Sequence, residues 1–235
     1  MKLFQAIRRQ LIQESNVKKY LLYAIGEILL VMIGITLAFQ VDNWNDNREK
    51  KIEEIRTYEN IREQILGDKE HIQGQIDYNN RFLVQFEYAR KIVMENDRIQ
   101  MDTLASIIAK LTSYSDYDRE GNIYETMVNS GKIQLLRNQD IVNHIRLLEQ
   151  RYNYVNRMEN IHYDVIMGHV APGITPSINF STTEIVMPER IFNNEFQNLI
   201  FLLVKIMHEK DNTYKTASDE IDKITALIDE ELNKG

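Results

Sequence analysis

The chain has 235 residues, no cysteine and a formal net charge of −7. The lack of cysteine excludes disulfide bonds and thiolate metal sites as supports of the fold. The acidic balance argues against DNA or RNA as a partner, because binding to phosphate requires a basic surface.

Residues 1–17 are predicted to form a cytoplasmic amphipathic segment. Apolar residues recur there at helical spacing, with Arg8 and Arg9 between them. This pattern is typical of a short helix that lies on a membrane surface. The alternative is a basic tail without regular structure.

Residues 18–41 are predicted to form a transmembrane helix. The run from Tyr20 to Val41 is the only apolar segment of the chain that is long enough to span a bilayer. A cleaved signal peptide is the alternative, but its apolar core is usually about 7–15 residues long. We therefore favour an uncleaved anchor.

The charge on either side of this helix predicts its orientation. Residues 1–19 hold five basic residues and one acidic residue, a net charge of +4, which leaves −11 for the remainder of the chain. Basic residues before a span keep that side in the cytoplasm. We therefore expect residues 42–235 to form a periplasmic helical domain.

One face of the apolar run from Tyr20 to Val41 carries the only charged residue of that run, Glu27. Ala24, Glu27, Val31, Gly34 and Ala38 follow three-four spacing and share a helical face. Small residues allow helices to approach closely in lipid, and an acid in hydrocarbon usually faces protein, water or a partner charge. We call these five residues the membrane stripe and predict that it is a helix–helix interface. The alternatives are a snorkelling Glu27 and an ion-coupled Glu27.

A long helix is predicted after the span. Trp44, the only tryptophan, is expected to anchor the chain at the membrane surface. Residues 47–96 contain no proline, and apolar residues recur there in one heptad phase. We call the following residues the heptad seam: Tyr58, Ile65, Ile72, Phe86 and Val93. The seam can pair with another subunit or with later helices of the same chain, and Asn79 in the same phase is either a register-setting or a solvated residue.

Capping residues predict the next helices. Asp102 or Thr103 is expected to cap a helix over residues 104–111. A short helix is expected to begin near Asn122 and to end before Gly131, because glycine readily takes the left-handed conformation that terminates helices.

The remainder of the chain is predicted to hold two longer helices. Asn138 or Asp140 is expected to cap the first of them. Residues 169–188 contain all three prolines and are expected to form an irregular loop. The last helix is expected over residues 192–232, buried near Leu199–Met207 and one-sided later.

Two stretches of the sequence resemble a known family. The first is Lys19 to Glu27 with Gly34, Gln40 and Asn43-Trp44-Asn45; the second is Tyr124-Glu125, Ser130-Gly131-Lys132-Ile133, Leu136 and Asn138. Together they resemble an uncharacterised family of single-pass membrane proteins that is common in Bacteroidota and carries a domain-of-unknown-function label. Residues 127–129 depart from the second stretch. The resemblance implies a bacterial inner-membrane protein and no reaction, ligand or catalytic residue.

The sequence contains no recognisable catalytic, metal or cofactor motif. His162 and His169 lie seven residues apart with Asp164 nearby, but further metal ligands are not marked. Tyrosines are frequent in the middle third of the chain and suit either core packing or a ligand pocket. We therefore expect no enzyme activity, no cofactor and no metal.

These observations predict an all-α protein, in which a transmembrane helix continues into a long helix and packs with a periplasmic helical bundle. The expected function is that of a structural or interaction protein in the bacterial inner membrane. Its expected partners are membrane lipid, a second copy of the chain or a multi-span membrane protein, and not nucleic acid. Alternatives are an extracytoplasmic sensor or ligand-binding module, and an ion-coupled subunit that uses Glu27.

Overall fold

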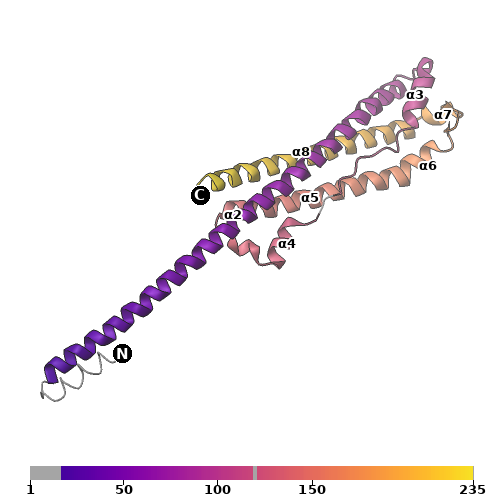
Figure 1. The fold of residues 1–235 in the computed structure, drawn as a ribbon. Helices are drawn as coiled ribbons and strands as arrows, with labels where there is room; N and C mark the ends of the chain where they lie inside the picture. Colours follow the sequence, from indigo (N-terminus) through magenta and orange to yellow (C-terminus); the bar gives the residue numbers. More distant parts are fainter. Residues whose placement is uncertain (1–16, 119–120, 235) are drawn as a thin grey trace. The chain divides into compact units, whose positions relative to one another are not determined.

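The computed structural model describes residues 17–118 and 121–234 and is almost entirely helical (Figure 1). The elements in chain order are α2 (Val17–Met94), η1 (Arg98–Gln100), α3 (Met101–Ile108), α4 (Ile123–Asn129), η2 (Lys132–Leu135), α5 (Gln139–Val165), η3 (Ile166–Val170), α6 (Ala171–Ile174), β1 (Ile178–Asn179), β2 (Glu184–Ile185), α7 (Pro188–Ile191) and α8 (Asn194–Asn233). The predicted all-α fold is confirmed, with one small antiparallel hairpin in which Ile178 faces Ile185.

The chain divides into two compact units, residues 1–54 and 55–235. The described part of the first unit is the beginning of α2. It holds a stretch, starting at Leu21, that is long and apolar enough to cross a membrane and that is not buried by the rest of the chain. The predicted amphipathic segment lies outside the described residues, apart from Val17 at the start of α2.

The second unit is built around three long helices: residues 55–94 of α2, α5 and α8. Polar contacts define their directions. Arg62 meets Asp229 and Lys69 meets Asp222, so α8 runs antiparallel to α2. The contact of His144 with Glu220, read together with that of His162 with Lys210, shows that α8 is also antiparallel to α5.

Two hydrophobic cores follow one another along this bundle. The first, which we call the loop-end core, includes Phe86 and Val93 of α2 together with α3, residues 166–191 and the first half of α8. The second, the long-helix core, includes residues 58–76 of α2, most of α5 and the second half of α8. Each fully buried aliphatic or aromatic side chain contributes about 1.5–3 kcal/mol of hydrophobic free energy.

The heptad seam lies within these two cores. Tyr58, Ile65 and Ile72 belong to the long-helix core, and Phe86 and Val93 belong to the loop-end core. The seam therefore packs against later helices of the same chain, which was one of the two alternatives that the sequence allowed. In this arrangement its side chains are not available to a second subunit.

Several predicted helix ends are confirmed by their caps. The Asn122 side chain accepts the Glu125 N–H at the start of α4, and Gly131, after that helix, has a φ of 71°. Asn138, rather than Asp140, caps α5 by accepting the Asp140 and Ile141 N–H groups.

The predicted cap at Asp102 or Thr103 is wrong. The helix begins one residue before Asp102, and Gln100 is its N-cap without a side-chain hydrogen bond. The preceding turn is capped instead by Asp97, whose Oδ1 accepts the Ile99 N–H at 3.1 Å. Asp102 lies in the first turn, where a carboxylate still interacts favourably with the helix dipole.

The predicted irregular loop over residues 169–188 is wrong for most of its length. The helical path continues through the π-helical turn η3 and α6 to Ile174, and a hairpin and α7 follow. Pro172 lacks an N–H group, but it lies in the first turn of α6, where that donor is not needed. The π-helical turn η3 is wider than an α-helical turn, and α6 begins directly after it at Ala171.

The first half of α8 is less buried than predicted. Ile200, Leu203, Val204, Ile206 and Met207 are buried as expected, but Phe201 and Leu202 remain exposed. The all-round apolar pattern near Leu199–Met207 therefore leaves apolar surface uncovered on this helix.

Candidate functional site

A layer of buried polar side chains separates the two cores. On α8 the loop-end core ends at Met207, the long-helix core begins at Tyr214, and Lys210 lies between them. On α5 the corresponding polar positions are Glu159 and His162. The layer also includes Asn79 of α2 and Ser115 of the segment that follows α3, so four segments contribute to it. We call it the polar layer.

Lys210 is the central cation of the polar layer and is fully buried. Its ammonium group donates to the Ser115 carbonyl oxygen and to His162 Nδ1, each at 2.8 Å. The Nζ atom also lies 5.9 Å from the centroid of the Tyr114 ring, within the range of a cation–π interaction. These contacts compensate the ammonium for part of its lost hydration.

The contact with Lys210 determines the tautomer of His162. Because the ammonium can only donate, Nδ1 must accept, and the neutral ring therefore carries its proton on Nε2. Within the described residues, Nε2 has no hydrogen-bond partner. A second proton on Nδ1 would place an N–H donor directly against the ammonium. Burial, followed by the charge of Lys210, accordingly lowers the pKa of His162 to about 3.

Glu159 is the anion of the polar layer. Its Oε1 accepts the Tyr117 N–H at 2.7 Å and the hydroxyl of Tyr214. The Tyr214 oxygen is also 3.4 Å from Ser115 Oγ. Because the single phenolic hydrogen goes to Glu159, Ser115 must be the donor in this second contact. The carboxyl group thus ties α5 to α8 and to the segment before α4.

Burial shifts both charged members of the layer toward their neutral forms. It raises the pKa of Glu159 to about 7, although the hydrogen bonds from Tyr214 and Tyr117 act in the opposite direction. It lowers the pKa of Lys210 to about 8, although the charge of Glu159 opposes this shift. Glu159 also lines a cavity with Asn156 and Asn160, which gives water a route to its carboxyl group.

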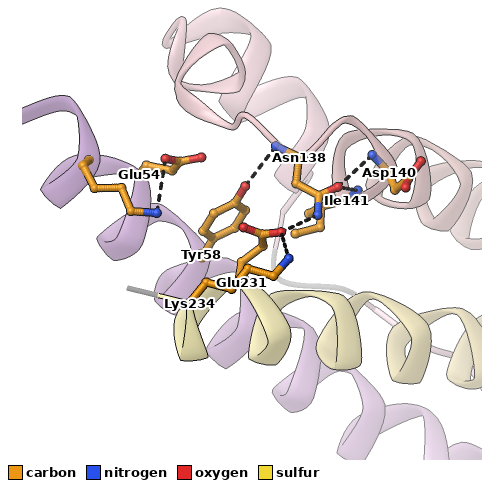
Figure 2. Close-up of polar contacts among 8 residues, drawn as sticks. Glu54, Tyr58, Asn138, Asp140, Ile141, Glu231 and Lys234 are labelled. Carbon is orange, nitrogen blue, oxygen red and sulfur yellow. Dashed lines mark hydrogen bonds and ion pairs between the residues drawn. The ribbon is translucent and has the colours of Figure 1, made fainter. Parts of the chain in front are cut away.

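Further polar contacts support the long-helix core. The Tyr152 hydroxyl donates to Asp68 Oδ2 at 2.8 Å, and both side chains are buried. Burial, followed by the charge of Asp68, raises the pKa of Tyr152. Near the end of α8, the Asn138 N–H donates to the Tyr58 hydroxyl, and the Asn138 amide donates to Glu231, which also binds Lys234 (Figure 2).

The chemistry that the polar layer can perform is the exchange of protons near neutral pH. Lys210 resembles an activated amine in its lowered pKa, but it is fully buried and has no open path to a substrate. Among residues 17–118 and 121–234 there is no cluster of three side chains that could hold a metal ion. The geometry is that of a structural network with a titratable group.

The residues predicted from the sequence lie elsewhere. Glu27, Val31, Gly34 and Ala38 of the membrane stripe are exposed on α2, Ala24 is partly exposed, and Trp44 is exposed as well. His162 and His169 do not share a site, because His162 is buried in the polar layer and His169 lines a cavity at the surface.

The sequence contains a signal for the polar layer that the predictions did not use. Lys210 lies three residues after Met207 and four before Tyr214, within the buried stripe of α8. Asn79 lies midway between Ile72 and Phe86 in the heptad seam. A polar residue in an apolar phase marks a buried polar contact.

The sequence profile of a family of unknown function (DUF6090) matches residues 27–209. The chain belongs to this family. The match starts at Glu27 in the membrane stripe and covers α5 with its polar-layer residues, Glu159 and His162, whereas Lys210 follows directly after it. The resemblance to an uncharacterised family is thereby confirmed, while the single-pass membrane character and the bacterial group of DUF6090 stay predictions. No curated protein and no solved structure matches the chain.

Proposed function

We propose that this protein is a membrane-anchored helical protein of the bacterial inner membrane that self-associates through the membrane stripe. Its N-terminus lies in the cytoplasm, and residues 42–235 form the periplasmic part. The excess of basic residues before the span supports this orientation.

The observation that carries the proposal is the exposed face of α2 that bears both Glu27 and Gly34. A Cβ atom added at Gly34 meets no other atom within 4 Å, so the chain's own fold does not require a glycine there. The same face of α2 bears Glu27, which is exposed and is the only charged residue of the apolar run. A close helix–helix contact in lipid uses both features, because a small residue permits backbone approach and a polar group bonds across the interface.

The heptad seam does not contribute to this association. Its residues are buried in the chain's own cores, where they stabilise the second unit. The proposal therefore places self-association in the membrane stripe alone, with Trp44 at the membrane surface as an anchor.

The test is the mass of the full-length protein in a mild detergent, measured by sedimentation equilibrium. We expect an oligomer whose association is weakened about tenfold by Glu27→Leu, and more strongly by Gly34→Leu. Gly26→Leu is the matched control. Gly26 lies off the stripe and is equally open, so it should leave association unchanged.

Glu27→Gln separates assembly from ion coupling. Glutamine retains a hydrogen-bonding group and cannot release a proton, so association should persist in this variant. A strictly monomeric wild-type protein, or equal losses in Gly26→Leu and Gly34→Leu, would disprove self-association through the stripe.

A further inference from the structure

A cavity of about 290 Å³ opens beside the first turns of α8. The walls are formed by His169 of η3, Gly173 of α6, Arg190 of α7 and Asn193, and α8 contributes the remaining side, including Glu195 and Asn198. The cavity lies wholly within the second unit. Its volume is at the lower end of the range for small-molecule sites, which indicates a ligand of about ten non-hydrogen atoms.

The floor of the cavity is apolar. It is formed by Phe196, Leu199 and Leu202 on one face of α8. Leu202 is 41% exposed, so this surface is not covered by the chain itself. A Cβ atom at Gly173 would lie 3.2 Å from Leu199 Cδ2, so the glycine allows α6 to approach the floor closely. The floor suits an aliphatic or aromatic group.

Two opposite charges border this floor without pairing. Arg190 and Glu195 both line the cavity, and both side chains are exposed. Within the described residues, neither side chain takes part in an ion pair or a hydrogen bond, either with the other or with a third group. Each charge is therefore available to a ligand.

We propose that this cavity binds an α-amino acid with an apolar side chain. The carboxylate of the ligand pairs with Arg190, its ammonium group pairs with Glu195, and its side chain packs on Leu199 and Leu202. A zwitterion satisfies both charges at once. A ligand that is only anionic leaves Glu195 unpaired, and a ligand that is only cationic leaves Arg190 unpaired.

The inference rests on the cavity alone and is independent of self-association through the membrane stripe. Because Arg190 and Glu195 are exposed to water, their contribution to the binding free energy of the ligand is modest. For a ligand of this size we expect a Kd of about 1 mM.

The test compares three fluorinated probes that share one aromatic ring: para-fluoro-L-phenylalanine, para-fluorophenylpropanoate and para-fluorophenethylamine. Binding to the full-length protein in lipid nanodiscs is measured by fluorine NMR of the probes at neutral pH. We expect the amino acid to bind about tenfold more tightly than either of the other two probes.

Each charge has its own variant. Glu195→Gln should reduce the affinity for the amino acid to the affinity for the propanoate, and it should not change the binding of the propanoate itself. Arg190→Gln should reduce the affinity for the amino acid to the affinity for the amine. Leu202→Asn should weaken all three probes. The matched controls are Lys205→Gln and Glu209→Gln, which remove the same charges from exposed positions of α8 outside the cavity.

Two results would overturn the proposal. One is that para-fluoro-L-phenylalanine shows no binding at a concentration about tenfold above the expected Kd. The other is that all three probes bind equally well to the wild type, to Arg190→Gln and to Glu195→Gln. Equal affinities would mean that the probes contact only the apolar floor and not the two charges. Circular dichroism at each step verifies that the variants are folded.

Discussion

Replacing His162 with asparagine should change how the stability of this protein depends on pH. Asparagine keeps a hydrogen-bond acceptor for Lys210 but does not titrate. The folded-state pKa of His162 is about 3, against an ordinary value of 6.5. Its contribution to stability is therefore fully present above pH 6.5 and is lost as the pH falls through 3.

Glu159 acts in the opposite direction. Its folded-state pKa is about 7, against an ordinary value of 4.5, so its contribution is present below pH 4.5 and is lost as the pH rises through 7. Between pH 4.5 and 6.5 the pH dependences of the His162 and Glu159 contributions have opposite signs and cancel in the wild type. In His162→Asn only the Glu159 contribution remains, so the variant should gain stability on acidification relative to the wild type.

The size of this difference follows from proton linkage. Between pH 6.5 and 3, the unfolding equilibrium constant of the wild type should rise by up to tenfold per pH unit relative to that of His162→Asn. The total is at most about 5 kcal/mol. Other groups that titrate in this range are present in both proteins and cancel in the comparison.

The assay is guanidinium unfolding of the full-length protein in detergent, followed by circular dichroism at a series of pH values from about 3.5 to 7.5. The difference in unfolding free energy between the two proteins should be constant above pH 6.5 and should change steadily below it. A difference that is independent of pH over the whole range would refute the assignment of His162 as a buried neutral base beside the Lys210 ammonium.

Two further substitutions test individual contacts by the same unfolding assay. Tyr152→Phe removes the hydrogen-bond donor to Asp68 and should lower the free energy of unfolding by about 1–3 kcal/mol. The double variant with Asp68→Leu should regain part of this loss. An unchanged stability of Tyr152→Phe would contradict the buried contact. Asn79→Leu should leave stability unchanged or raise it by up to about 1 kcal/mol, because Asn79 Oδ1 has no partner within the described residues and the position lies in an apolar seam. A loss of more than about 2 kcal/mol would show that the Asn79 bond to the Met207 carbonyl oxygen is required.

Local signals predicted the helices and several of their ends correctly. Asn122 and Asn138 cap α4 and α5, and Gly131 takes the left-handed conformation after α4. Such features depend on the neighbouring residues alone, because a capping side chain bonds N–H groups two or three positions away. The long proline-free stretch of α2 was predicted for the same reason.

Errors arose where the outcome depended on distant segments. The prolines of residues 169–188 indicated an irregular loop, but packing against α3 and α8 holds most of this segment in helical turns and a hairpin. Phe201 and Leu202 read as core residues, yet none of the segments that the structure describes covers them fully. The spacing of apolar residues shows which face of a helix is apolar, but it does not show whether another element of the fold covers that face.

The sequence by itself determined that this is an all-α protein with one apolar stretch long enough to cross a membrane, since both follow from the spacing of apolar residues and from run length. Only the tertiary structure decided that the heptad seam packs within the chain and that Lys210, Glu159 and His162 form a buried layer. The apolar phase around Lys210 marks the position as buried, but it does not show which group compensates the charge. The role of a charged residue is set by segments far away in the sequence, which place a compensating group within hydrogen-bonding distance or leave it in solvent.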